Sequence, residues 1–409
     1  MAKEYKDLVV GLDIGTSKIM VVVAEVLPGG LLKIAGFGVS PSNGLKRGVV
    51  VNIDATVQSI QQALREAELM ADCKIGRVYT GITGSHIRGI NSSGMVAIKD
   101  KEVSRSDVRR VLDTATAINI SNDQRLLLVE SQEFVIDGQD VKDPIGMSGI
   151  RLEAKVHIVT GAQSAAENII KCVHRCGLEV EHLMLNPMAS SLAVLTNDER
   201  ELGVVLVDIG AGTTDVAVFT GGAIRHTAVI PIAGDLITSD IAMALRTPTK
   251  DAEEIKIDSG FAKQLLTDPD SQVEVPGLGD RGPRLLSKQA LAGVIEPRIE
   301  EIFTLVQQAI RETGYEEVLS SGIVLTGGAS VMPGMIELGE DIFLKPVRRG
   351  IPKYSGNLSD MVAQARASTV MGLLEEASLA RLRGMKVGHN NGSIKNTLSR
   401  AKDWLIGNF

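Results

Sequence analysis

Two short segments with the same order of residue types stand about 195 residues apart and could bind phosphate. The first runs from Val10 to Lys18 and the second from Val205 to Asp215. Each is an apolar run that ends in Asp-Ile-Gly, followed by small hydroxylated residues and a second β-branched run, which predicts a β-hairpin with a tight turn. Backbone N–H groups and hydroxyls in such turns bind phosphate, and the preceding carboxylate can hold a hydrated metal ion. The pair therefore predicts a nucleotide held between two duplicated halves.

Other residues could contribute to such a site. The segment 326–328, Thr-Gly-Gly, follows an apolar run, and its adjacent glycines would let the backbone approach a flat ligand. Lys18 could neutralise phosphate as a compact point charge. Glu253 and Lys256 lie three residues apart on a predicted helix and share one face, although a surface ion pair would explain them as well. The chain has no Gly-x₄-Gly-Lys-Ser/Thr motif, so this is not a P-loop.

Cys172 and Cys176 share one face of a predicted helix and could suggest a metal site. Cysteine is among the most buried residue types, however, and no second cluster of ligands follows. The pattern favours a structural role in the core.

The predicted elements place the two turns in two similar halves. In the first half we expect strands at 8–12, 18–26 and 78–81 and a helix at about 53–70. Between 85 and 161 short strands at 95–98, 125–135 and 151–158 surround a helix at about 106–119. This stretch indicates a small inserted subdomain, because a helix at 162–175 then resumes the earlier pattern. The second half begins at about 201, with a polar, helical region between 231 and 314, a strand at 322–325 and a last helix at 358–381.

Composition limits the possible classes of protein. A chain of 409 residues with 44% hydrophobic and 23% charged residues can form two to three globular domains. The net charge of −7 gives no support for binding nucleic acid. Three cysteines cannot form a disulfide framework, which predicts a reducing, cytoplasmic compartment. We expect neither a signal peptide nor a membrane-spanning helix, since no apolar run is long enough.

The C-terminal residues form a second informative pattern. At 100° per residue, six apolar side chains of 393–409 fall within a face of about 140°: Ile394, Leu398, Ala401, Trp404, Leu405 and Phe409. Arg400 and Lys402 lie at opposite edges of this face. A Gly/Asn-rich linker, 384–392, precedes the segment. Basic flanks and interfacial aromatic residues are typical of a helix that lies on anionic lipid, although a terminal amphipathic helix can also dock on its own domain.

The motifs together resemble the nucleotide site of the actin, Hsp70 and sugar-kinase superfamily. Its five motifs follow in order: the two hairpins, a first connector at 185–195, an adenosine motif at 323–334 and a second connector at 365–374. Within the superfamily, the chain resembles the FtsA family of bacterial cell-division proteins over essentially residues 7 to 409. Four further segments carry that resemblance: Gly44-Leu-Lys-Arg-Gly48, Gly81-Ile-Thr-Gly84, Gln132-Glu133-Phe-Val-Ile-Asp137-Gly138 and Pro346-Val-Arg-Arg-Gly350.

The resemblance implies an α/β, actin-like ATPase fold: two duplicated ribonuclease H-like domains around a nucleotide cleft, with a small α+β subdomain inserted in the first. We therefore expect the following divisions: 1–84 with 162–199 as the first actin-like domain (1A), 85–161 as the inserted subdomain (1C), 200–233 with 315–383 as the second domain (2A), 234–314 as subdomain 2B, 384–392 as a flexible linker and 393–409 as a membrane-binding helix.

The resemblance also implies roles for individual residues, with ATP and Mg²⁺ as cofactors. Asp13 and Asp208 would hold Mg²⁺ through water. Glu253 and Lys256 would reach the ribose and adenine. The remaining nucleotide contacts would come from Gly15, Thr16, Ser17, Lys18, Gly210, Gly212, Thr213, Thr214, Gly234, Gly327, Gly328 and Ala329.

One residue departs from the superfamily pattern. Hsp70-type members carry a Glu immediately before the connector proline, where it positions the attacking water, and this chain has Asn186 there. An amide can orient water but cannot accept its proton near neutral pH. We therefore expect firm ATP binding and slow hydrolysis.

The resemblance finally implies partners and a cellular role. The helix that carries Arg298 and Glu301 is similar to the FtsA region that docks the C-terminal tail of FtsZ, and subdomain 1C would contact other division proteins. The membrane face would comprise Ile394, Leu398, Arg400, Lys402, Trp404, Leu405 and Phe409. The expected function is an ATP-binding protein that polymerises on the cytoplasmic side of the inner membrane at the division septum and tethers the FtsZ ring there.

Two alternatives share the hairpins. An actin-like adaptor of type IV pilus assembly, of the PilM type, would be expected to lack the basic-flanked terminal helix. A small-molecule kinase of the sugar-kinase branch would need a catalytic Asp that faces a sugar pocket, and the sequence offers no such candidate.

Overall fold

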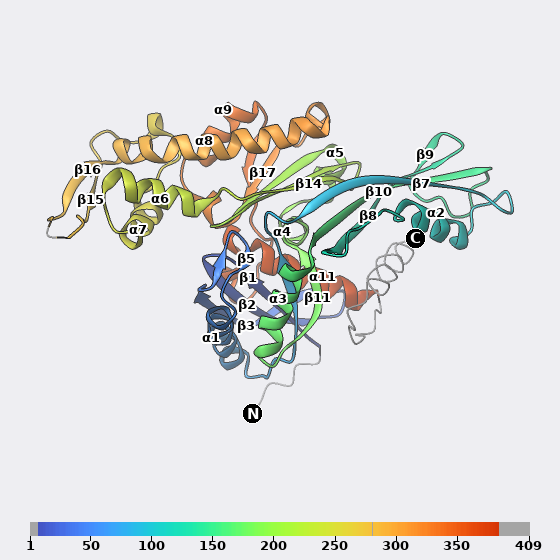
Figure 1. Cartoon of the computed structure of the whole chain (residues 1–409), viewed down its shortest axis with the longest axis horizontal. Coiled ribbons are helices and arrows are strands. Elements are labelled where there is room, and N and C mark those ends of the chain that lie inside the picture. Colours follow the sequence, from blue (N-terminus) through green and yellow to red (C-terminus); the bar gives the residue numbers. More distant parts are fainter. Residues whose placement is uncertain (1–6, 280, 384–409) are drawn as a thin grey trace.

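The computed structural model describes residues 7–279 and 281–383 and has two similar domains, one above the other in Figure 1. The predicted linker 384–392 and terminal helix 393–409 lie outside the described residues. No helix in the described part of the chain is long and apolar enough to cross a membrane.

The two domains contain five-stranded sheets of identical topology. In the first, the order is β11-β6-β1-β2-β3, and in the second it is β18-β17-β12-β13-β14. In each sheet the three strands that come first in the chain, β1 to β3 and β12 to β14, pair in antiparallel fashion, and the other two run parallel to the central strand, β1 or β12. The first sheet comprises β1 (Leu8–Ile14), β2 (Lys18–Val26), β3 (Leu32–Pro41), β6 (Arg77–Ile82) and β11 (Glu179–Leu185). The second comprises β12 (Val204–Ile209), β13 (Thr214–Thr220), β14 (Ala223–Ile230), β17 (Ile323–Thr326) and β18 (Val347–Arg349). The predicted duplication is confirmed.

Helices cover the outer face of each sheet. On the first sheet these are α1 (Ile53–Ala71) and α3 (Gln163–Arg175), which bury the side chains of Leu12 and Val21. The Asn52 side chain caps α1 by accepting a hydrogen bond from the Ala55 amide, and the buried residues of α1 recur at helical spacing. Of the predicted cysteine pair, Cys172 is buried on α3, and Cys176, directly after the end of α3, is half-buried in the apolar core. The described residues contain no group of three or more His, Cys, Asp or Glu side chains that could hold a metal ion.

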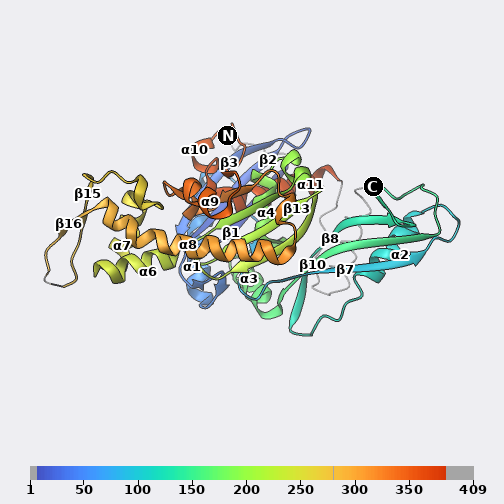
Figure 2. The same cartoon turned by 90° about the horizontal axis from the view of Figure 1, so that it is seen from above.

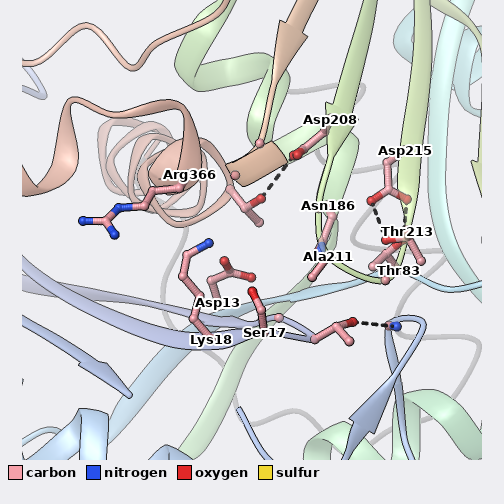
Figure 3. Close-up of a pocket in the computed structure, with 18 of the residues that line it drawn as sticks. Asp13, Ser17, Lys18, Thr83, Asn186, Asp208, Ala211, Thr213, Asp215 and Arg366 are labelled. Atoms are coloured by element: carbon pink, nitrogen blue, oxygen red, sulfur yellow. Dashed lines mark hydrogen bonds between the residues drawn. The ribbon is translucent and has the colours of Figure 1, made fainter. Parts of the chain in front are cut away.

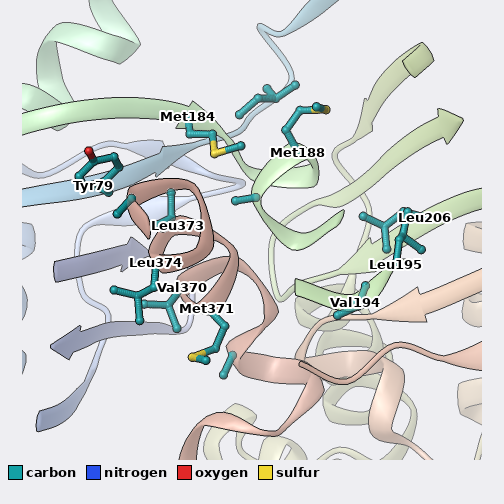
Figure 4. Close-up of a cluster of buried hydrophobic side chains, with 14 of the residues drawn as sticks. Tyr79, Met184, Met188, Val194, Leu195, Leu206, Val370, Met371, Leu373 and Leu374 are labelled. Carbon is teal, nitrogen blue, oxygen red and sulfur yellow. The ribbon is translucent and has the colours of Figure 1, made fainter. Parts of the chain in front are cut away.

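Two helices lie between the sheets and hold the domains together. They are α4 (Asn186–Val194) and α11 (Ser368–Leu382), and their apolar side chains join both sheets in one core (Figure 4). Met20 and Val22 enter this core from the first sheet, and Leu206 and Phe219 enter it from the second. The two domains therefore share a buried base.

A four-stranded antiparallel sheet is inserted in the first domain and extends to the right in Figures 1 and 2. Its order is β7-β10-β8-β9, and α2 packs on it over a separate core. The elements are β7 (Arg88–Ala97), α2 (Arg105–Ala115), β8 (Gln124–Ile136), β9 (Gln139–Val141) and β10 (Arg151–Ala162). The first strand begins seven residues before its predicted start, and α2 ends four residues before its predicted end.

The inserted subdomain also contacts the second domain through polar side chains at β14. Nε2 of the buried His157 lies 3.0 Å from the Thr227 hydroxyl. Arg225 forms an ion pair of 2.6 Å with Glu133, and the Gln132 amide donates to the Ile224 carbonyl at 2.8 Å. These bonds join the subdomain to the domain in which it is not inserted.

The region after β14 forms the opposite end of the molecule in Figure 2. It contains the expected helices α6 (Gly234–Leu245), α7 (Thr249–Ser259) and α8 (Lys288–Thr313), with the short η1 (Gln264–Leu266). It also contains a hairpin that the sequence did not predict, formed by β15 (Gln272–Val275) and β16 (Arg284–Ser287). Short elements elsewhere in the chain complete the fold: β4 (Leu45–Lys46), β5 (Val49–Val50), α5 (Asn197–Leu202), η2 (Glu316–Val318), η3 (Gly328–Val331) and α9 (Met335–Phe343).

The last predicted helix, 358–381, is wrong as a single element. The structure has α10 (Ser359–Val362), a break, η4 (Ala365–Ala367) and then α11. Gln364 is extended, and the Ala365 carbonyl accepts a hydrogen bond from the Gly327 amide at 3.2 Å. This contact with a distant turn outweighs the local helical preference.

Substitution of one glycine in the shared base tests the close packing of α11 on α4. A Cβ atom at Gly372 would lie 1.7 Å from the Ala189 carbonyl oxygen, so the helices would have to separate. Gly372→Ala should therefore lower the free energy of unfolding by about 1–3 kcal/mol, although alanine favours helix. Urea unfolding measures this. Gly76→Ala is the matched control, because a Cβ there meets nothing within 4 Å. Equal stability of the two variants would contradict the packing.

Candidate functional site

A cleft with about 550 Å³ of free space lies between the two hairpin turns, above the shared base (Figure 3). Twelve of the predicted site residues line it: Asp13, Gly15, Thr16, Ser17, Lys18, Asn186, Asp208, Gly210, Gly212, Thr213, Gly327 and Gly328.

The two turns have the same backbone geometry. The Gly15 amide donates to the Lys18 carbonyl at 3.0 Å, and the Gly210 amide donates to the Thr213 carbonyl at 2.9 Å. The turns also touch across the cleft, because a Cβ at Gly212 would lie 2.6 Å from the Thr16 hydroxyl. The remaining turn amides and hydroxyls therefore face one small volume from both domains.

The Gly327–Gly328 turn forms a third wall of the cleft, in addition to the two hairpin turns. Gly327 has a φ of +87°, and a Cβ there would lie 2.3 Å from the Asp208 carboxylate, so the position requires glycine. Thr326 fixes the turn from below by donating to the Gly350 carbonyl at 2.9 Å. The backbone can thus pass close to a flat ligand, as the sequence predicted.

Three buried carboxylates stand in the cleft. Burial raises the pKa of Asp13 to about 6, with Lys18 opposing and Asp208 adding to the shift. Burial also raises the pKa of Asp208, although hydrogen bonds from Ser190 and Thr369 oppose it. Burial and the nearby Asp208 raise the pKa of Asp215 to about 8, and Thr83 and Thr213 donate to this carboxylate. The buried surroundings of the cleft therefore disfavour negative charge on its own aspartates.

These features fit a nucleotide with a divalent cation. Asp13 and Asp208 come from the two domains, and a hard cation with oxygen ligands would offset the cost of ionising them. Glycine at Gly15 and Gly212 lets the turns pack closely, since a Cβ would lie 2.9 Å from the Lys18 carbonyl oxygen or 2.6 Å from the Thr16 hydroxyl, and turn amides are phosphate donors. The Asn186 Oδ1 atom is buried and has no hydrogen-bond partner in the described structure, so it can accept from a bound group.

Five predicted residues do not line the cleft. The Thr214 hydroxyl donates to the Ile232 carbonyl at 2.8 Å and is buried in the sheet. Lys256 forms a 2.6 Å ion pair with Glu253 and donates to the Gly234 carbonyl at 3.2 Å. A Cβ at Gly234 would lie 3.5 Å from that of Ala329, so these four residues gather beside the Gly327–Gly328 wall. Their nucleotide roles stay predictions.

The sequence did not single out eight residues that do line the cleft. They are Ile14, Gly48, Thr83, Ala211, Asp215, Ala365, Arg366 and Thr369. Asp215 and Thr83 stand inside the recognised segments, and Arg366 and Thr369 stand in the second connector, so their positions in the motifs were a usable signal. Nothing local in the sequence indicates that Thr83 pairs with Asp215 across the two domains.

The predicted partner residues lie on α8, away from the cleft. Arg298 bonds to both carboxylate oxygens of Asp240 on α6, at 2.6 and 3.0 Å, and also pairs with Glu301. Arg298 therefore links α8 to α6, and its partner role stays a prediction.

Comparison with known proteins identifies the family. The chain is 54% identical over 409 residues to the "Cell division protein FtsA" of Pseudomonas aeruginosa, with 98% of each chain covered. This chain belongs to the FtsA family. Models of the family described as "Cell division protein FtsA" and "SHS2 domain inserted in FTSA" match residues 205–372 and 84–160. The FtsA relationship supports a role in cell division.

Solved structures of lower identity share the fold. A structure of the PilM-PilN type IV pilus biogenesis complex has a TM-score of 0.61 at 17% identity, over 90% of this chain and 98% of the other. MreB5 of Spiroplasma citri bound to ADP has a TM-score of 0.57 at 14% identity, over 93% and 99%. With the identical order of the two sheets, these likenesses confirm the predicted actin-like fold.

Asp215→Asn should change how stability depends on pH in the ligand-free protein. The pKa of Asp215 is about 8 in the folded state, whereas an unfolded aspartate ionises at about 3.9. Between these values the folded state holds a proton that the unfolded state has lost. The contribution of this carboxyl is thus greatest at low pH, falls as pH rises through the window and is level above about 8.

The variant cannot ionise, so it does not lose this stability as the pH rises. The unfolding free energy of the variant minus that of the parent should therefore be larger at pH 8 than at pH 5, by at least about 1 kcal/mol. Urea unfolding without nucleotide or Mg²⁺ measures both proteins. Asp140→Asn, at an exposed position on β9, controls for the lost charge. A difference that is the same at every pH would contradict the assignment.

Proposed function

We propose that this FtsA-family chain binds ATP with Mg²⁺ in the cleft and uses it as a conformational switch for assembly. The observation that carries the proposal is the pair of equivalent turns that face each other across one cleft, with a buried aspartate at the start of each. Asp13 and Asp208 would hold Mg²⁺ through water, and the turn amides with Lys18 would bind the phosphates. The ADP-bound MreB5 of the same fold supports a nucleotide at this place.

Slow hydrolysis follows from the residue at the start of α4. Asn186 occupies the position from which a carboxylate would assist the attacking water, and its Oδ1 can orient water but not take up a proton. We expect bound ATP to persist much longer than on an efficient Hsp70-like ATPase. Single-turnover hydrolysis of radiolabelled ATP measures this, and Asp13→Asn serves as the control for contaminating ATPases. A rate equal to that of an Hsp70-like enzyme would contradict the switch model.

The membrane part of the proposal rests on the terminal sequence. The apolar face of 393–409 with its basic flanks would lie on anionic lipid of the inner membrane, on the cytoplasmic side. One short helix is a reversible anchor, because ordering it on lipid opposes the gain from burial. A row of polymerised subunits would multiply the strength of attachment through avidity. In this way the chain would tether the division ring at the septum.

Two surfaces would serve partners in division. The Arg298–Glu301 part of α8 would dock the C-terminal tail of FtsZ, and the inserted subdomain would contact later division proteins and neighbouring subunits. The pilus-adaptor alternative is not supported by the likeness to PilM, since that shows the fold alone. The kinase alternative has no catalytic carboxylate assigned to a sugar pocket.

Membrane attachment is tested by co-sedimentation with anionic liposomes, with and without Mg·ATP. The full-length chain should pellet, more strongly with ATP, whereas a chain that ends at Asn391 should stay in solution. Trp404→Glu should also release the protein, because it places a charge in the apolar face. Lys395→Gln, which leaves that face intact, is the milder matched change. If the shortened and full-length chains pellet alike, the tether model is wrong.

A further inference from the structure

Arg366 is a cation of the cleft whose guanidinium makes no stabilising contact within the described fold. It lines the cleft and is exposed, and it forms no hydrogen bond or ion pair with any residue that the structure describes. Figure 3 shows the Arg366 side chain near Lys18, with its guanidinium directed away from Asp13 and Asp208. An arginine at a structural position would instead be expected to have carboxylate or carbonyl partners.

The backbone presents Arg366 to the cleft because the last helix is broken. Ala365 accepts from the Gly327 amide at 3.2 Å, and this contact places η4 against the third wall. The Arg366 Cβ lies 3.9 Å from the position of a Cβ on Gly328. A continuous helix would not make this contact, so the break sets the arginine beside the glycine wall.

Arg366 and Lys18 form a pair of like charges that reach the cleft from different domains. Burial lowers the pKa of Lys18, Asp13 and Asp208 oppose that shift, and the positive charge of Arg366 adds to it. The Lys18 ammonium has no hydrogen bond in the described structure either. A polyanion bound between the two cations would relieve their repulsion and occupy donors that are otherwise free.

We infer that Arg366 is a nucleotide-binding residue that contacts the polyphosphate chain, opposite Lys18. The inference rests on the proposed function, because it assigns a further residue to the same site. A guanidinium matches phosphate with two parallel N–H donors and is more weakly hydrated than an ammonium. Arg366 thereby links the bound nucleotide to η4 and α11, the helix in the shared base of the domains.

Calorimetric titration of the full chain with Mg·ATP and Mg·tripolyphosphate tests the inference. Arg366→Gln should weaken both ligands about tenfold or more, and Arg366→Lys should recover part of the loss. Arg105→Gln is the matched control, since Arg105 is exposed on the inserted subdomain. Without ligand, Arg366→Gln should melt no lower than the parent, because the guanidinium has no hydrogen-bond or ion-pair partner within the described protein and only repels Lys18.

The outcomes separate this inference from the proposed function. If the parent binds Mg·ATP and Arg366→Gln binds it equally well, the inference is overturned and the ATP site stands. If Arg366→Gln weakens Mg·ATP but not Mg·tripolyphosphate, Arg366 contacts the nucleoside, and the polyphosphate assignment is wrong. If the parent binds neither ligand, the proposed function fails together with the inference.

Discussion

The contact between α4 and α11 is the constraint on which the rest of the structure depends. These helices lie between the two sheets, and Gly372 brings one backbone onto the other at Ala189. At the other end Gly11 of β1 faces the Val370 carbonyl, where a Cβ would lie at 2.9 Å. Backbone on backbone leaves no side chain that could adjust. The base therefore fixes the distance between β1 and β12, and with it the separation of the two turns above.

A fixed base explains why carboxylates stand in a cleft whose buried surroundings disfavour their charge. Asp13, Asp208 and Asp215 extend from strands anchored in the two cores, so they cannot retreat to water when they ionise. Ionising these buried carboxylates costs free energy, which is seen in their raised pKa values. A bound cation, held together with a polyanion, would offset this cost. Binding and domain arrangement are thus coupled, since each domain contributes carboxylates and a cation to the cleft.

Much of the fold could be predicted from the sequence, because the Asp-Ile-Gly turns and their flanking strands are encoded locally and twice. The same local chemistry, together with the family resemblance that pointed to Asn186, predicted twelve residues of the cleft. The break before α11 could not be predicted, since Ala365 bonds to Gly327 across the fold, and so Arg366 was missed. The Thr83–Asp215 bond has the same origin. For the amphipathic segment 393–409, which lies outside the described residues, the sequence pattern remains the whole argument.

The position of α11 in the chain has a consequence for biosynthesis. Gly11 and its neighbour Val370 are separated by about 360 residues, yet α11 covers one apolar face of the first sheet. While the ribosome is translating, the part of that face that α11 covers stays open until nearly all of the described chain has emerged. Such long-range closure slows folding and leaves strand surface open to aggregation. The N-terminal domain is thus made first and completed last.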